Sequence, residues 1–196
     1  MREGKNNTTL KAIYIRLFLR LKNLLVKPAT QWKAILREEN DINDVLSVYS
    51  LPLIGLCTLS TFISILVNLQ EINFEIALKH ALITFTSLFG GLYLCYLSTN
   101  RIMSWFQVSL SKTINFKLIA YSSTPLLVIT FFVNLFPELI LLYLASAYSY
   151  YIIWHGIKGL PGIKAESVLT LGTIITLLIH LVPFAIQRLL LKLIFT

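Results

Sequence analysis

LIAYSSTPLLVITFFVNLF, residues 118–136, is the stretch of sequence that decides the fold. It contains no Asp, Glu, Lys, Arg or His over nineteen residues. An α-helix of about 20 apolar residues is long enough to cross the hydrocarbon core of a bilayer. The stretch therefore predicts a membrane-spanning helix.

The first turns of this helix are rich in hydroxyl groups. Pro125 lacks a backbone N–H, which leaves one carbonyl of the preceding turn without its usual donor. A nearby Ser or Thr hydroxyl can satisfy that carbonyl inside a membrane. We therefore take as a candidate helix-contact or binding motif the residues Tyr121, Ser122, Ser123, Thr124 and Pro125.

The composition of the whole chain indicates an integral membrane protein. Of its 196 residues, 56% are hydrophobic and 13% are charged, whereas soluble domains carry about 25% charged residues. The apolar residues come in long blocks, which predicts an all-α polytopic protein with five transmembrane helices. The expected spans are residues 50–69, 76–98, 118–136, 139–155 and 168–186. In the second span, Gly90 and Gly91 favour a close approach of two helix backbones.

The N-terminal segment predicts a basic amphipathic helix over residues 10–27. Between residues 4 and 37 there are eight Lys or Arg and no acid. Such a helix lies in the headgroup plane near anionic lipid; the alternative is that its apolar face packs on the spans. The candidate contacts to lipid or to a partner are Arg16, Arg20 and Lys27. The expected apolar face comprises Leu10, Ile13, Tyr14, Leu17, Phe18, Leu21, Leu24 and Leu25.

Two regions follow from this pattern: a cytoplasmic N-terminal segment, residues 1–49, and a five-helix transmembrane domain, residues 50–196. Trp32 is placed where an indole anchors at a membrane interface. The acidic run 38–44 predicts a solvated loop before the first span.

The distribution of charge predicts the orientation. With the N-terminus inside, Lys and Arg number 14 on the cytoplasmic side and 3 on the far side. Cytoplasmic loops carry an excess of Lys and Arg, so we expect a cytoplasmic N-terminus and a C-terminus on the far side. The net charge of +8 is thereby attributed to topology and not to nucleic-acid binding. Arg188 and Lys192 lie on the unfavoured side, and an alternative is that the tail LLLKLIFT lies along the membrane surface.

The expected spans contain few side chains that could act in catalysis, metal binding or proton transfer. No Asp, Glu, Lys or Arg lies in the central part of any expected span, and such groups are the usual marks of proton relays and ion pathways. His80 and His180 could share a leaflet near Glu71 and Glu75, but no metal-ligand spacing supports a site. Ser122 and Ser123 lack the glycine-flanked setting of a hydrolase nucleophile. We therefore predict no enzyme activity, no cofactor and no metal.

Several motifs, in this order, resemble the bacterial branch of the Yip1 family. They are Pro28-Ala29-Thr30-Gln31-Trp32 at the entry, Ala120-Tyr121-Ser122-Ser123-Thr124-Pro125 in the third span, Gly156-Ile157-Lys158-Gly159-Leu160-Pro161, and Lys164-Ala165-Glu166. The resemblance covers roughly residues 20–186. It implies five spans, a cytoplasmic N-terminus and a short far-side C-terminus, in a bacterial inner membrane.

Eukaryotic members of that family take part in vesicle traffic between the endoplasmic reticulum and the Golgi, and they bind Rab GTPases and each other. This sequence lacks their Asp-Leu-Tyr-Gly-Pro motif; the nearest residues are Tyr49-Ser50-Leu51-Pro52. Rab binding is therefore not carried over.

Two functions are compatible with these features. The first is a non-enzymatic membrane scaffold that binds anionic headgroups and associates with other membrane proteins or with itself. The second is a small transporter or channel, because helices broken near a proline form binding sites in transporters. Its expected lining is Ser60, Ser64, Asn68, Thr84, Ser122, Ser123, Thr124, Asn134, Thr173 and Thr176.

Overall fold

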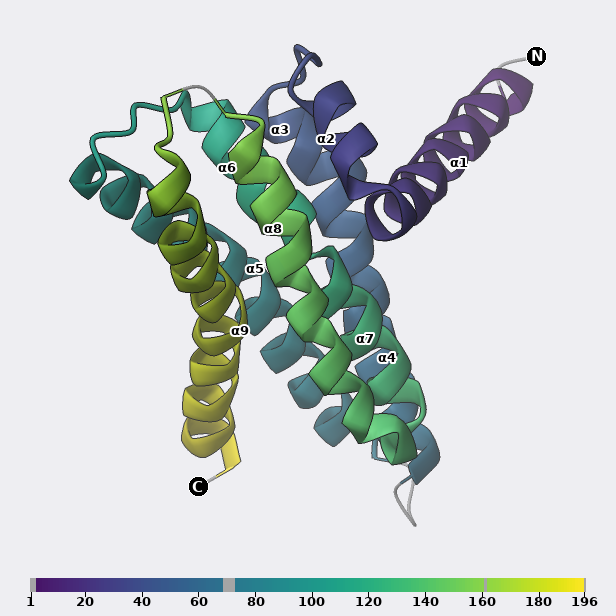
Figure 1. The fold of residues 1–196 in the computed structure, drawn as a ribbon. Coiled ribbons are helices and arrows are strands. Elements are labelled where there is room, and N and C mark those ends of the chain that lie inside the picture. Colours follow the sequence, from purple (N-terminus) through teal and green to yellow (C-terminus); the bar gives the residue numbers. More distant parts are fainter. Residues whose placement is uncertain (1–2, 69–72, 161, 196) are drawn as a thin grey trace.

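A computed structural model describes residues 3–68, 73–160 and 162–195 of the chain. Helices account for 88% of it and no strand occurs in the described residues, which confirms the all-α class. Figure 1 shows a bundle whose N-terminal helices gather at one end, while the C-terminus lies at the other. The side chains of Leu10 and Asn68, together with Glu71 and Pro161, lie outside the described part.

Five helical runs are long and apolar enough to cross a membrane, which confirms the predicted number of spans. They are Ile42–Val67, Phe74–Trp105, Lys112–Leu135, Pro137–Lys158 and Ala165–Phe195. Each run starts before the expected span, because polar residues at the ends lower the hydropathy without breaking the helical hydrogen bonds. The first run starts inside the segment that the sequence assigns to the N-terminal region.

Three of the five runs change helical geometry along their length. The first consists of α3 (Ile42–Val45), a π-helical turn η1 (Leu46–Ser50) and α4 (Leu51–Asn68). The second is α5 (Phe74–Trp105), and the third is divided into α6 (Lys112–Ser122) and α7 (Thr124–Leu135). The fourth begins as a 3-10 helix η2 (Pro137–Tyr148) and continues as α8 (Ser149–Lys158). The fifth is α9 (Ala165–Phe195).

The third run is the centre of the bundle. In its apolar window 67% of the residues are buried, against 22% to 44% in the other four runs. Its division at Ser123 follows from Pro125, which lacks the N–H that the Tyr121 carbonyl would accept. Thr124 Oγ1 donates to that carbonyl at 2.6 Å. This hydrogen bond is the hydroxyl compensation that the sequence predicts.

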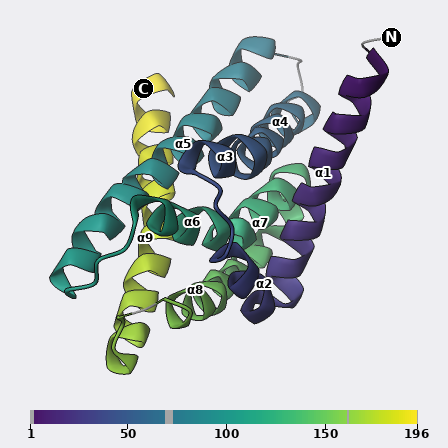
Figure 2. The same ribbon diagram turned by 90° about the horizontal axis from the view of Figure 1, so that it is seen from above.

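The N-terminal helices α1 (Glu3–Val26) and α2 (Pro28–Ile35) pack on the bundle as a bent pair. Seen from above in Figure 2, α1 runs along one side of the bundle, where it contacts α7. Leu17 and Leu24 are buried, whereas Tyr14 and Phe18 are exposed. The helix is therefore present, but its expected amphipathic division is not confirmed.

The closest helix approach that involves a glycine in a span occurs between α5 and α9. A Cβ atom added to Gly91 would lie 2.6 Å from Pro183 Cγ and 3.1 Å from Pro183 Cα. The adjacent Gly90 has more room, since its nearest neighbour would be a side-chain atom of Ile186 at 3.8 Å. Helix α9 passes through Pro183 without ending and continues to Phe195, so residues 189–195 of the tail extend the helical run; Thr196 lies outside the described residues.

We predict that Gly91→Ala lowers the stability of the protein, whereas Gly90→Ala does not. Overpacking a tight contact costs typically about 1–3 kcal/mol, and at Gly91 the α9 backbone itself must move. At Gly90, alanine fits and removes the roughly 1 kcal/mol disadvantage of a helical glycine. The measurement is the apparent melting temperature in detergent micelles. Equal melting temperatures of the two variants would contradict the assigned helix contact.

Candidate contact site at the α1–α3 end

Polar contacts join the N-terminal helices to the bundle where α1, α2 and α3 meet α6, α7 and α8. We call this cluster the junction. Its members are Arg20, Trp32, Glu38, Tyr49, Lys117, Tyr121 and Thr124.

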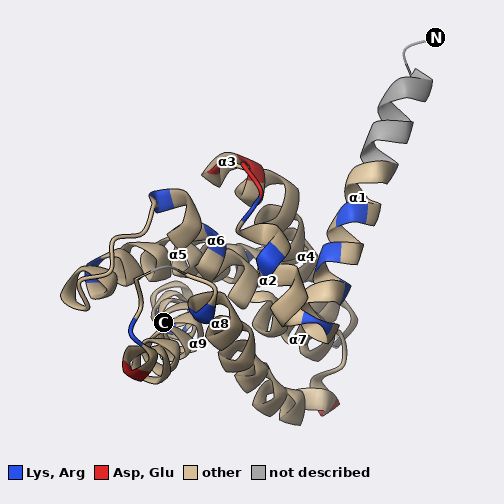
Figure 3. Ribbon diagram, turned by 45° about the horizontal axis from the view of Figure 1, so that its top comes forward, with Lys and Arg blue, Asp and Glu red and all other residues tan. Residues whose placement is uncertain are grey.

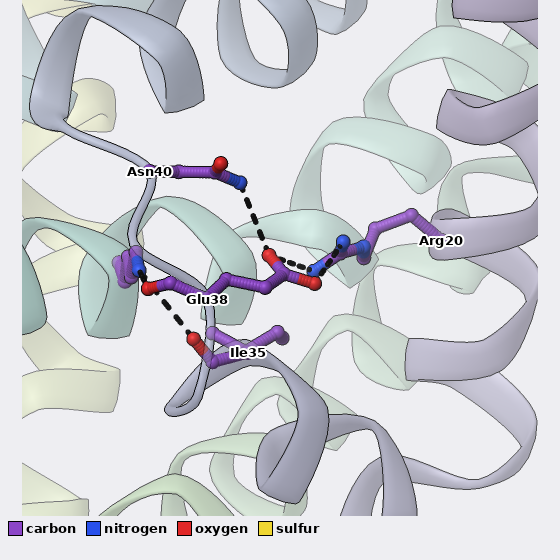
Figure 4. Close-up of polar contacts among 5 residues, drawn as sticks. Arg20, Ile35, Glu38 and Asn40 are labelled. Atoms are coloured by element: carbon purple, nitrogen blue, oxygen red, sulfur yellow. Dashed lines mark hydrogen bonds and ion pairs between the residues drawn. The ribbon is translucent and has the colours of Figure 1, made fainter.

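Arg20 and Glu38 form a two-point ion pair at the edge of the junction. Arg20 Nη1 donates to Glu38 Oε2 at 3.0 Å, and Nη2 donates to Oε1 at 2.5 Å. Asn40 Nδ2 donates to the same carboxylate at 3.1 Å, as Figure 4 shows. Burial lowers the pKa of Arg20, but the hydrogen bond and charge of Glu38 outweigh it, so the pKa is raised. The guanidinium stays charged and ties α1 to the segment after α2.

Lys117 lies inside the junction with only 3% of its surface exposed. Its Nζ donates to the backbone carbonyl of Glu38 at 2.7 Å and to that of Ile35 at 3.4 Å. The Ile35 carbonyl belongs to the last residue of α2, where a helix carries partial negative charge, and the Glu38 carbonyl belongs to the turn that follows. A buried cation from α6 therefore holds the C-terminal end of α2 and the turn after it.

Trp32 anchors α2 to the fourth run. Its Nε1–H donates to the Ile152 carbonyl at 2.8 Å, and its side chain is 2% exposed. The indole occupies a space that exists because residue 156 is glycine: a Cβ there would lie 2.8 Å from the Trp32 ring. The expectation of an interfacial anchor is therefore wrong, because the indole faces the protein interior.

The sequence motif 121–125 lies partly within the junction. Tyr121 and Thr124 are junction members, and the other three residues are their neighbours in the third run. Tyr49 and Thr124 have their hydroxyl oxygens 2.6 Å apart. Since the Thr124 hydroxyl already donates to the Tyr121 carbonyl, Tyr49 is the donor of this contact. The Tyr49 and Tyr121 rings meet at 4.7 Å between centroids. All five motif residues, Tyr121, Ser122, Ser123, Thr124 and Pro125, are buried.

The cavity that borders this motif is small. The cavity lined by Ser123 has a volume of about 20 Å³, which is room for about one water molecule. The motif thus makes contacts between helices of the same chain, and its role as a site for another molecule stays a prediction.

The three predicted lipid or partner contacts differ in their surroundings. Arg16 and Lys27 are exposed, whereas Arg20 faces Glu38. Of the acidic run, Glu38 belongs to the junction, while Asp41 caps α3 through a reciprocal pair with Asp44. Sequence reasoning missed Glu38 as the partner of Arg20, and it missed Lys117 as a donor to the backbone carbonyls after α2. The only signal for Lys117 was its place one residue before the apolar stretch.

The histidines weighed as metal ligands have other partners. His80 stacks on Phe195, with ring centroids 4.8 Å apart. His180 bonds the Thr176 carbonyl through Nδ1 at 2.8 Å and Ser146 Oγ through Nε2 at 2.9 Å. Within the described residues, no group of three or more His, Cys, Asp or Glu could hold a metal ion.

Comparison with known proteins gives one match. The family model of the Yip1 domain matches residues 22–186, which is most of the chain. The matched region starts within α1, after Arg20, and includes the other junction residues, the first four runs and the fifth run as far as Ile186. Neither a curated protein nor a solved structure matches the chain.

We predict that Trp32→Ala loosens the N-terminal helices. Truncation of a buried aromatic costs about 3–5 kcal/mol, while Trp32→Phe, which loses the hydrogen bond but keeps a ring, costs about 1 kcal/mol. The measurements are the melting temperature and the rate of tryptic cleavage within α1 and α2. The matched control is Trp105→Ala, because Trp105 is 79% exposed. Cleavage rates equal to wild type in Trp32→Ala would contradict the anchoring role.

Proposed function

The chain belongs to the Yip1 family, and from this membership we propose that it is a membrane scaffold whose α1–α3 end binds anionic lipid and another membrane protein. Yip1 proteins are generally non-catalytic membrane proteins. The proposal has a bacterial inner membrane as its setting, with the N-terminus in the cytoplasm.

The observation that carries the proposal is the attachment of α1 and α2 to the bundle by side-chain contacts. Trp32, Lys117 and the Arg20–Glu38 pair hold both helices on the bundle. Exposed cations on these helices, among them Arg16 and Lys27, therefore lie at the same end of the bundle. Figure 3 shows Lys and Arg along α1 and α2, with acidic residues near the start of α3.

The exposed side of α1 supports lipid contact. Tyr14, Ile15, Phe18 and Leu19 are exposed apolar side chains of this helix, and Arg16 lies between them in sequence. A helix that offers both aromatic and cationic groups suits the boundary between acyl chains and anionic headgroups. Basic residues near such a surface contribute about 1 kcal/mol each.

Transport is the second function compatible with the sequence, and the positions of its expected lining residues do not favour it. Thr84 and Asn134 line a cavity at the end opposite α1–α3. Ser122 and Thr124 are buried in the third run, and Thr173 is exposed. Of the expected lining residues that the structure describes, only Thr84 and Asn134 line this cavity.

We predict that neutralising exposed cations of α1 reduces partner capture. The double variant Arg16→Gln/Lys27→Gln should recover severalfold less crosslinked partner from native membranes, because the charge that steers and holds an acidic partner is lost. Captured proteins are quantified by mass spectrometry against wild type.

The matched control is Lys164→Gln, which removes an exposed cation from the loop before α9. Equal recovery from the double variant and wild type would refute the proposed surface. Recovery of the chain alone, lost in the double variant, would make the partner a second copy.

We predict that the N-terminus is cytoplasmic and the C-terminus is on the far side. The bias of 14 to 3 in Lys and Arg drives this orientation. Green fluorescent protein fused to the N-terminus should fluoresce, whereas at the C-terminus it should stay dark and alkaline phosphatase should be active. A fluorescent C-terminal fusion would reverse the assignment of the α1–α3 end to the cytoplasm.

A further inference from the structure

A cavity of about 590 Å³ lies at the end of the bundle opposite α1–α3. Its walls come from α5, α7, η2 and α9. The volume falls within the roughly 300–1,000 Å³ range of ligand pockets. Nothing in the proposed scaffold function uses this cavity.

The 3-10 geometry of η2 forms one wall. Ile140, Tyr143 and Ser146 all line the cavity and are spaced by three residues. In a 3-10 helix side chains three apart lie in one row, so these residues form a single strip. Ser146 also meets His180 of α9, and this hydrogen bond at 2.9 Å connects the two walls.

Most polar groups in the cavity wall already have partners within the protein. Ser87 Oγ donates to the Ile83 carbonyl at 2.6 Å, and Thr84 shares a hydrogen bond with Thr61. The Asn134 amide nitrogen donates to Thr61 at 2.8 Å. With these donors occupied, the wall offers mainly apolar surface to a ligand.

The mouth of the cavity is more polar than its interior. Gln187 and Arg188 line it, both are exposed, and neither makes a hydrogen bond or ion pair within the described residues. The Arg188 guanidinium lies 5.1 Å from the centroid of the Phe184 ring. No Asp or Glu lies among the lining residues, so the mouth favours an anion.

The dimensions of the cavity match one leaflet. Along α9 the lining runs from His180 to Leu191, which corresponds to about 16 Å at the helical rise. Half of a hydrocarbon core of about 30 Å is similar. Leu181 and Phe184 line the cavity and are 58% and 53% exposed. The cavity therefore opens laterally, toward the lipid that would surround this span.

We infer that this cavity binds one acyl chain whose anionic head lies at Gln187 and Arg188. The apolar interior accepts the chain, and the guanidinium with its neighbouring amide pairs with the headgroup. This site also gives Arg188 a role on the side of the membrane that the charge rule disfavours. It is separate from the α1–α3 surface and does not depend on the proposed scaffold function.

The test is photocrosslinking of the full chain in nanodiscs. The probes carry a diazirine near the end of the acyl chain and are phosphatidylglycerol, phosphatidylcholine with the same chain, and oleate. Phosphatidylglycerol should label cavity residues of α5, α7, η2 and α9 roughly three- to tenfold more than phosphatidylcholine, the range expected for one partly exposed charge contact. Arg188→Gln should remove this difference.

Two matched controls separate the site from general lipid contact. Lys192→Gln removes a cation one turn further along α9 that does not line the cavity, and it should retain the preference. Leu181→Trp narrows the opening and should reduce labelling, whereas Leu177→Trp, one turn earlier, should not. Leu177 and Leu181 are both more than half exposed, so both variants should fold.

The outcomes decide the proposal. Stronger labelling by oleate than by phosphatidylglycerol, lost in Arg188→Gln, would identify the ligand as a free fatty acid anion and support the site. Equal labelling by the charged and neutral lipids, or labelling outside the cavity only, would overturn it. Capture of a partner through Arg16 and Lys27 is measured separately, so each proposal fails on its own experiment.

Discussion

The hydrogen bond from the Trp32 indole to the Ile152 carbonyl is the contact on which the arrangement of the N-terminal helices depends. A buried indole N–H needs an acceptor, and one is available here because Gly156 leaves space for the ring. The contact joins residues 120 positions apart in the sequence. It determines where α2 lies, and α2 in turn determines where Lys117 and Glu38 can meet.

The interior of the junction combines charge with a low-polarity environment. Between spans in lipid there is no hydrophobic driving force, so packing and polar contacts decide how helices associate. The Lys117 ammonium is held by two backbone carbonyls, and the Arg20 guanidinium by a carboxylate. These contacts satisfy charged groups that would be costly to bury alone. They also bind α1 and α2 to the bundle.

The third run links the two ends of the molecule. Its N-terminal part, α6, supplies Lys117 and Tyr121 to the junction. Its C-terminal part, α7, lines the cavity at the other end of the bundle through Leu126, Thr130 and Asn134. Apart from Thr124, the junction residues of this run lie before the division at Ser123, and its cavity residues lie after it. Pro125 forces the change of helix, and the hydroxyl of Thr124 prevents it from leaving the Tyr121 carbonyl unpaired. One local sequence feature therefore allows a single run to serve both ends.

The sequence by itself determined the helical class, the number of spans, the family and the compensated break at Pro125. These features are local, because a bilayer requires long apolar helices that satisfy their own backbone groups. Only the tertiary structure decided that Trp32 is buried, that Arg20 turns toward Glu38, that Lys117 holds the end of α2 and the turn after it, and that Gly91 rests on Pro183. It also decided where the cavity at His180 and Arg188 lies. Each of these depends on residues distant in the chain or on helix geometry such as that of η2, which hydropathy and periodicity do not encode.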